Sequence, residues 1–153
     1  MSRNRLNKTE EKYYLGVDFG MSKLGLALAE NITKIAFIYG KLQNDKNLLE
    51  KITQIIKEKN ISQVIIGVPW KSGFKVNYKD KNSLAKYNAV ENKVRKLGKA
   101  IQNIFPKIEI IYQNEMFTTK MAQANLKAKK AKNVSKEDDQ EAARIILQSW
   151  LDN

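Results

Sequence analysis

Cysteine and histidine are both absent from this chain of 153 residues, and only two prolines occur in it. The lack of cysteine excludes disulfide bonds and thiolate metal sites. The lack of histidine excludes serine–histidine and cysteine–histidine catalysis, together with the usual histidine-containing zinc site. Any acid–base or metal chemistry must therefore use carboxylates, lysines or tyrosines. Carboxylate oxygens are ligands that suit Mg²⁺ or Mn²⁺.

Long apolar runs are also missing. The apolar stretch at residues 64–68 is far too short to cross a bilayer, and residues 1–5 do not resemble a secretory signal. We therefore expect a cytoplasmic protein with no membrane partner. The first 12 residues are polar and aperiodic, which predicts a flexible N-terminal arm followed by a single domain over residues 13–153.

Positive charge is plentiful and unevenly distributed. The formal net charge is +12; residues 71–107 hold ten Lys or Arg against two acids, and residues 120–136 hold six lysines and no acid. Aromatic side chains alternate with lysines in the first of these segments, in the order Trp70, Lys71, Phe74, Lys75, Tyr78 and Lys79. This mixture is typical of loops that contact phosphates and stack on bases. The alternative is that Trp70 covers the sheet edge and the lysines are merely solvated.

Hydrophobic periodicity predicts five strands and four helices. The predicted strands cover residues 13–19, 23–29, 34–39, 63–68 and 108–112, and the predicted helices begin near residue 48 and cover 83–105, 119–131 and 137–151. In the helix at 83–105, one face is expected to hold Leu84, Tyr87, Val94, Leu97, Ile101 and Ile104. Three antiparallel strands followed by parallel crossovers predict an α/β fold of the ribonuclease-H-like type, with a five-stranded mixed sheet and helices on both faces.

The first strand ends in an acidic residue, Asp18. One interpretation is that Asp18 is a turn residue and that Gly20 and Gly25 are required only by the backbone conformation. The other is a carboxylate that a rigid strand fixes at the open edge of the sheet. In that case Gly20 and Gly25 would bracket a hairpin tip able to approach a phosphate closely.

A second acid, Glu115, follows the fifth predicted strand. A surface glutamate after a strand is commonplace. If the first, fourth and fifth strands are parallel, however, Asp18 and Glu115 emerge at the same carboxyl edge, where open α/β sheets bind ligands.

The last helix contains the third candidate. Ser135 and the acids after it could simply cap this helix and complement its dipole. Helical spacing nevertheless places Asp139 on the same face as Ala142, Ala143, Ile146 and Trp150, whereas Asp138 is rotated by about 100°. An acid on a buried face needs a partner, and a metal ion would provide one.

Together these patterns predict metal-dependent phosphodiester hydrolysis. Asp18, Glu115 and Asp139 are the predicted catalytic acids and metal ligands, because a bound Mg²⁺ would relieve their repulsion and admit nucleic acid. The predicted substrate contacts are Lys23, Trp70, Lys71, Lys75, Lys79, Thr118 and Lys120.

Four segments, in this order, resemble the YqgF/RuvX family. They are residues 16–20 (GVDFG) with 23–27 (KLGLA), then 65–69 (IIGVP), 114–119 (NEMFTT) and 139–147 (DQEAARIIL). The family was proposed to be Holliday-junction resolvases and is now usually described as pre-16S ribosomal RNA nucleases.

The resemblance implies a ribonuclease-H-like fold, a divalent metal cofactor, and structured RNA or branched DNA as the substrate. It also implies a role in maturing the 5′ end of small-subunit ribosomal RNA in the bacterial cytoplasm, and catalytic acids at Asp18, Glu115 and Asp139. Two triplets depart from the family pattern: Asn114-Glu115-Met116 stands where Asp-Glu-Arg is common, and Met21-Ser22-Lys23 stands where Thr-Lys-Arg is common. Met116 replaces a common arginine, which could clamp a phosphate where methionine cannot, and Ser22 stands where lysine is common.

Two other functions are compatible with parts of the sequence. The glycine-containing hairpin after Asp18 also resembles the first phosphate loop of actin-like ATPases, which need two lobes where this chain supplies one. A non-catalytic RNA-binding ribosome-assembly factor fits the charge. Three acids in the binding groove argue against it, because they would repel RNA.

Overall fold

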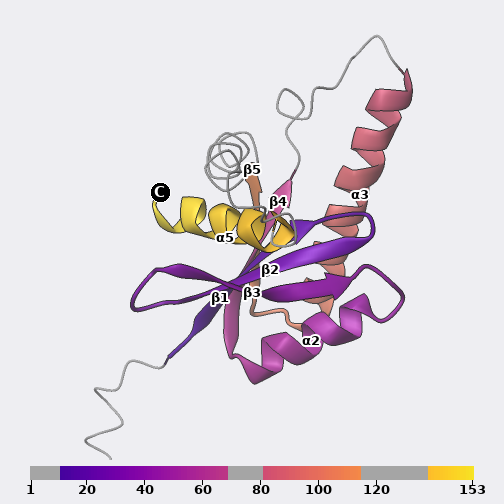
Figure 1. The fold of residues 1–153 in the computed structure, drawn as a ribbon. Helices are drawn as coiled ribbons and strands as arrows, with labels where there is room; N and C mark the ends of the chain where they lie inside the picture. Colours follow the sequence, from indigo (N-terminus) through magenta and orange to yellow (C-terminus); the bar gives the residue numbers. More distant parts are fainter. Residues whose placement is uncertain (1–10, 69–80, 115–137) are drawn as a thin grey trace, which may run out of the picture.

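The computed structural model describes residues 11–68, 81–114 and 138–153 of the chain. Figure 1 shows one mixed sheet with helices packed around it. The strands are β1 (Tyr13–Phe19), β2 (Lys23–Glu30), β3 (Ala36–Gln43), β4 (Ile61–Val68) and β5 (Glu109–Asn114). The helices are α2 (Leu48–Glu58), α3 (Lys81–Ile104) and α5 (Asp138–Leu151).

The five strands lie in the order β3-β2-β1-β4-β5. The first three form an antiparallel meander, while β4 is parallel to both β1 and β5. The predicted five-stranded mixed sheet is therefore confirmed. Its parallel part has buried strands, as Val64, Ile65 and Ile66 on β4 are all inaccessible to solvent. Strands covered on both faces need such continuous apolar runs.

Large aliphatic side chains fill the face of the sheet that α2 and α3 cover. Helix α2 contributes Leu48, Ile52, Ile55 and Ile56, whose helical spacing forms one apolar stripe. From the sheet, alternate residues such as Leu15, Val17 and Leu24 point into the same cluster. Helix α3 adds Val94, Leu97 and Ile101.

The opposite face is lined by small residues and is covered by α5. Ala27 and Ala29 of β2 belong to this second core, together with Ala143 and Leu147 of α5. A Cβ atom added at Gly16 of β1 would lie 2.7 Å from the Cβ of Leu147, so only glycine allows the observed approach. The helices thus lie on both faces, as the sequence predicted.

Two details of the prediction are wrong. The third strand runs from Ala36 to Gln43 rather than over residues 34–39, because Lys34 has a φ of 55°, a left-handed conformation that cannot continue a strand. In α3, Ile104 is 45% exposed and does not share the buried face of Val94. Ile104 ends the helix, and the following Phe105 packs against the core in its place.

Other parts of the prediction cannot be compared. The helix predicted over residues 119–131 lies outside the described residues, as do the side chains of Leu84 and Tyr87. Within the described ranges, none of the helices combines the length and apolar character that crossing a bilayer requires.

Candidate active site at the carboxyl edge of the sheet

The parallel strands β1, β4 and β5 end at one edge of the sheet. Val17 pairs with Ile66, and Ile66 in turn pairs with Tyr112, so the three strands are aligned across this region. Asp18 is the residue directly after Val17 and the second-to-last residue of β1. It is therefore positioned at the carboxyl edge, where open α/β sheets bind ligands.

Asp18 and Asp139 are brought together at Gly25. In the ladder between β1 and β2, Asp18 pairs with Gly25, so their positions on the sheet face α5. The backbone carbonyl of Asp139, in the first turn of α5, lies directly against Gly25, where a Cβ atom would overlap it. Both aspartates are half-buried. The first and last elements of the domain thus bring the backbone of Asp139 and the position of Asp18 on β1 to the same glycine.

This contact corrects one interpretation from the sequence. The sequence allows Gly20 and Gly25 to bracket a hairpin tip that approaches a phosphate. Because the Asp139 carbonyl already occupies the space above Gly25, this glycine serves the packing of α5. Gly20 is similarly crowded by the carbonyl of Lys23, as a tight hairpin requires.

The position of α5 above the sheet is fixed by contacts along its C-terminal half. The amide of Ala36 donates a hydrogen bond of 2.8 Å to the Oε1 of Gln148. The rings of Tyr14 and Trp150 meet edge to face, with their centroids 5.2 Å apart. Because a helix is rigid, these contacts also determine where its first turn, and hence Asp139, lies relative to Asp18.

The hairpin after Asp18 is held by Asn44, which the sequence analysis did not identify. The Nδ2 of Asn44 donates a hydrogen bond of 2.8 Å to the carbonyl of Gly20, and its backbone amide donates one of 2.9 Å to the carbonyl of Ser22. Asn44 follows the end of β3, so this clamp depends on strand pairing. We infer that Asn44 is a positioning residue for the end of β1.

A third acid of α5, Glu141, is buried and is already engaged with an arginine. Arg144 donates hydrogen bonds to Glu141 through both Nε and Nη2, at 3.2 and 2.6 Å. The side-chain hydrogen bond with Glu141 raises the pKa of Arg144. Arg144 therefore neutralises this carboxylate and donates to both of its oxygens.

Lys23, one of the predicted substrate contacts, begins β2 and is exposed, on the same face of the sheet as Gly25. The remaining predicted site residues lie outside the described part of the chain; they are Trp70, Lys71, Lys75, Lys79, Glu115, Thr118 and Lys120. Strand β5 ends at Asn114, the residue before Glu115, and Asn114 pairs with Val68 at the carboxyl edge.

The donors at this edge suit a hard divalent cation, because carboxylate oxygens are the preferred ligands of Mg²⁺ and Mn²⁺. In the ranges that the structure describes, no three acidic, histidine or cysteine side chains form a group that could hold a metal ion. Of the three predicted metal ligands, Asp18 and Asp139 are among the described residues and Glu115 is not.

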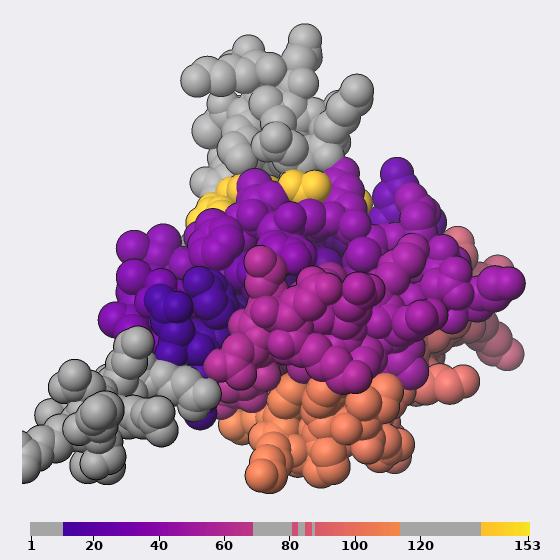
Figure 2. Space-filling model, turned by 90° about the horizontal axis from the view of Figure 1, so that it is seen from below, coloured from indigo at the N-terminus to yellow at the C-terminus, as the bar shows by residue number. Residues whose placement is uncertain are grey.

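A cavity of about 460 Å³ lies at the opposite, amino edge of the parallel strands. Its lining comes mainly from the segments 56–61 and 104–108, which Figure 2 shows side by side in magenta and orange. The lining includes Ile56, Ile61 and Phe105 but no carboxylate. This cavity therefore lacks the groups that a magnesium site needs.

Comparison with protein families gives a match over almost the whole chain. The family model described as "RuvX: Holliday junction resolvase" matches residues 12–153. A relative from Sulfurihydrogenibium sp. (strain YO3AOP1) is 32% identical over 142 residues, covering 90% of this chain and 88% of the relative. A relative from Mycoplasmopsis synoviae (strain 53) is 32% identical over 146 residues, covering 90% and 96%. Both bear the provisional name of pre-16S rRNA nuclease.

Solved structures share the fold. The T. thermophilus RuvC in complex with a Holliday junction substrate superposes with a TM-score of 0.54 at 11% identity, over 93% of this chain and 97% of that one. The yeast mitochondrial Holliday junction resolvase gives a TM-score of 0.52 at 12% identity, over 90% and 77%. At these identities the likeness concerns the fold alone, and it confirms the predicted ribonuclease-H-like architecture.

Proposed function

Because the chain belongs to the RuvX family, we propose that it is a nuclease that hydrolyses phosphodiester bonds of structured nucleic acid. The observation that carries this proposal is the meeting of Asp18 and Asp139 at Gly25, on the carboxyl edge of the sheet. The carboxylates of these two residues, which come from a strand and a helix far apart in sequence, would form the kind of acidic centre that metal-dependent phosphoryl transfer needs.

The proposed metal ligands are Asp18, Glu115 and Asp139, and the proposed cofactor is Mg²⁺ or Mn²⁺. A bound divalent ion would stabilise the negative charge that develops on the phosphate during hydrolysis. The chain itself positions the ligands. Strand β1 holds Asp18, Asn44 fixes the hairpin that follows it, and the packing of α5 holds Asp139 over β2.

The proposed substrate is the precursor of 16S ribosomal RNA, cut near its 5′ end in the cytoplasm, with branched DNA as the other structured candidate. Support comes from the relatives, which bear the name pre-16S rRNA nuclease, and from the family description as Holliday junction resolvase. The proposed binding surface combines Lys23 with the lysine-rich segments 71–107 and 120–136. A non-catalytic RNA-binding assembly factor is the weaker alternative, because a pure binder gains nothing from carboxylates in its binding groove.

Two neighbouring aspartates offer a direct test. Asp139→Asn should lower cleavage of a labelled precursor RNA in Mg²⁺ by about a thousandfold, because an amide is a poorer magnesium ligand than a carboxylate. The variant should remain folded in a thermal melt. Asp138→Asn is the matched control: it should stay within a few-fold of the unmodified protein and lose only about 0.3–1 kcal/mol of stability from the helix dipole.

Three results would contradict the proposal. If Asp138→Asn is inactive and Asp139→Asn is active, the assignment of the acids on α5 is wrong. If the unmodified protein binds the RNA but does not cut it in Mg²⁺ or Mn²⁺, the non-catalytic alternative is correct. Cleavage that persists in a chelator would contradict the proposed metal.

A further inference from the structure

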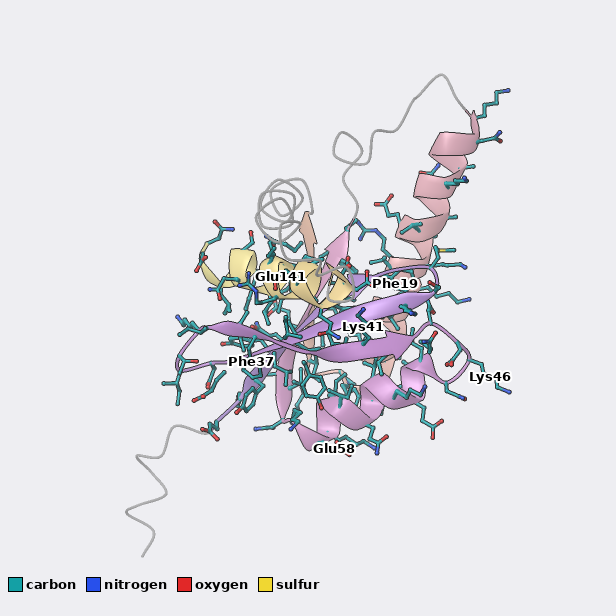
Figure 3. All side chains as sticks on the ribbon, in the orientation of Figure 1. Phe19, Phe37, Lys41, Lys46, Glu58 and Glu141 are labelled. Atoms are coloured by element: carbon teal, nitrogen blue, oxygen red, sulfur yellow. The ribbon has the colours of Figure 1, made fainter. Side chains whose placement is uncertain are left out.

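Lys41 of β3 lies in the same row of the sheet as Asp18. Gly25 pairs with Asp18 on one side and with Lys41 on the other, so the three residues are aligned across β1, β2 and β3. Residues opposite each other on neighbouring strands share a face, which here is the face that α5 covers. Figure 3 labels Lys41 on β3 and Phe19, the last residue of β1.

The distance across this row suits a side chain that reaches toward the acids. Two strand spacings of about 4.8 Å place the Cα atoms of Lys41 and Asp18 about 10 Å apart. Gly25 stands between them without a side chain, and lysine carries its ammonium group on a flexible four-carbon stem. Lys41 thus supplies a positive charge on the β3 side of the candidate centre.

The burial of Lys41 distinguishes it from most lysines of the described ranges, which are exposed. Lys51 and Lys59 are also half-buried, but they lie on α2 and just after it, against the other face of the sheet. A half-buried lysine covers its stem with apolar neighbours and keeps its ammonium group accessible. Its position is better defined than that of an exposed lysine.

A second lysine extends the charge toward the open edge. Lys23 pairs with Gln43, two residues along β3 from Lys41. Diagonal neighbours of this kind are about 7–8 Å apart and lie on one face, so the two ammonium groups can contact different phosphates of one strand. The first turn of helix α5 lies above Gly25. The pair of Lys23 and Gln43 is two residues farther along the strands, past the N-terminal end of the helix.

We propose that Lys41 binds a backbone phosphate of the nucleic-acid strand on the β3 side of the Asp18–Asp139 centre. This inference rests on the proposed nuclease function and adds a substrate contact to it. A lysine ammonium group has three donors, so it can bind a phosphate oxygen while it keeps a contact within the protein. A phosphate contact carries no sequence information; it sets affinity and the register of the strand.

Lys41→Gln tests the contact, because it removes the charge and keeps a polar side chain of moderate length. Binding of a fluorescently labelled RNA stem–loop is measured by anisotropy from 50 to 300 mM KCl, without divalent ions. One lost duplex phosphate contact should flatten the slope of log K against log salt by about 0.9. The Kd at 100 mM KCl should rise about tenfold. Lys41→Arg should restore most of both values.

Lys57→Gln is the matched control. Lys57 lies in α2 and lines the cavity at the amino edge, so its loss changes the net charge equally at a distant position. Its salt slope should equal that of the unmodified protein. In cleavage assays, Lys41→Gln should raise KM with kcat within about threefold, which is the signature of lost ground-state binding.

The outcomes separate the two proposals. An unmodified protein that binds RNA but does not cut it would refute the nuclease function, and the salt slope would still decide the role of Lys41. An active protein whose salt slope does not change in Lys41→Gln would overturn the Lys41 contact alone. A fall in kcat and in melting temperature with an unchanged slope would show that Lys41 supports the acids instead, which also overturns it.

Discussion

The two faces of the sheet are built from different residues. On the face toward α2 and α3, large side chains such as Leu15, Leu26 and Ile52 interdigitate, and no candidate acid lies among them. On the face toward α5, glycine and alanine let the helix backbone touch the strands, and both described acids of the candidate site belong to this face. One face therefore supplies most of the large apolar burial, while the other determines how closely a functional helix approaches the sheet.

This difference predicts that the two faces respond differently to substitution. Truncating one buried apolar side chain lowers the free energy of unfolding without moving a distant group, because each such side chain contributes separately to that free energy. Where two backbone segments are in contact, an added side-chain atom must displace one of them, because neither can rotate away. Substitutions on the α5 face should therefore change activity more than stability, and those on the other face should do the reverse.

Among the substitutions that compare the two faces, the largest effect is expected from Gly25→Ala. The added Cβ atom overlaps the carbonyl of Asp139, so the first turn of α5 must move. A displacement of about 1 Å at a catalytic group can lower turnover about a hundredfold, and overpacking costs about 1–3 kcal/mol. Cleavage assays and thermal melts measure both.

Gly40→Ala is the matched control for this change. Gly40 lies in β3, and a Cβ atom there would have no neighbour within 4 Å. Stability should change by less than about 0.5 kcal/mol, and activity should be preserved. Equal losses of activity in Gly25→Ala and Gly40→Ala would mean that the approach of α5 does not position the site.

Ile52→Ala should give the opposite pattern. Ile52 is fully buried between α2 and the sheet, so its truncation leaves a cavity and should cost about 2–5 kcal/mol of stability. Turnover at a temperature where the variant is folded should stay within about threefold. A loss of turnover as large as that of Gly25→Ala would show that the two faces are not separable.

The sequence alone predicted the elements and their arrangement well, for identifiable reasons. Strands β1 and β4 are continuous apolar runs, and α2 carries a regular apolar stripe, so local pattern and final burial agree. Helical spacing also placed Asp139 on the sheet-facing side of α5, in line with Ala143. The same reasoning misplaced the third strand, because Gly40, Lys41 and Gln43 give its end little apolar pattern and pairing with β2 continues it.

Residues whose roles depend on strand register were missed. Asn44 contacts the hairpin after β1, and Lys41 joins the row of Asp18, only because β3 pairs with β2 in one particular register. That register includes an irregularity between Leu26 and Ala27, which shifts the pairing by one residue. A pattern of apolar and polar residues does not encode such a shift, so neither role could be found before the strands were paired.

After Gly25→Ala and Ile52→Ala, a third and smaller effect is expected from Gly98→Ala, on the α2 and α3 face. Gly98 of α3 also makes a close approach, but its neighbours on β5 are side-chain atoms, mainly the hydroxyl end of Tyr112 and also the Cγ2 of Ile110, and the Tyr112 ring can move. Alanine is better than glycine in a helix by about 1 kcal/mol, and this gain offsets part of the lost contact. The net change in stability should therefore lie within about 1 kcal/mol, and cleavage should be unaffected.

Tyr112 itself reports whether this explanation is right. Burial raises the pKa of its phenol, and the guanidinium of Arg95, 4.8 Å from the ring centroid, lowers it by a smaller amount. If the ring swings outward in Gly98→Ala, the pKa of Tyr112 should fall toward its ordinary value, because burial is the larger of the two effects. NMR titration of ring-labelled tyrosine measures this directly. Gly98→Ala could instead lose as much activity as Gly25→Ala. An overlap with a movable side chain would then disturb the site as much as an overlap with a fixed backbone carbonyl, and the two faces could not be distinguished on this basis.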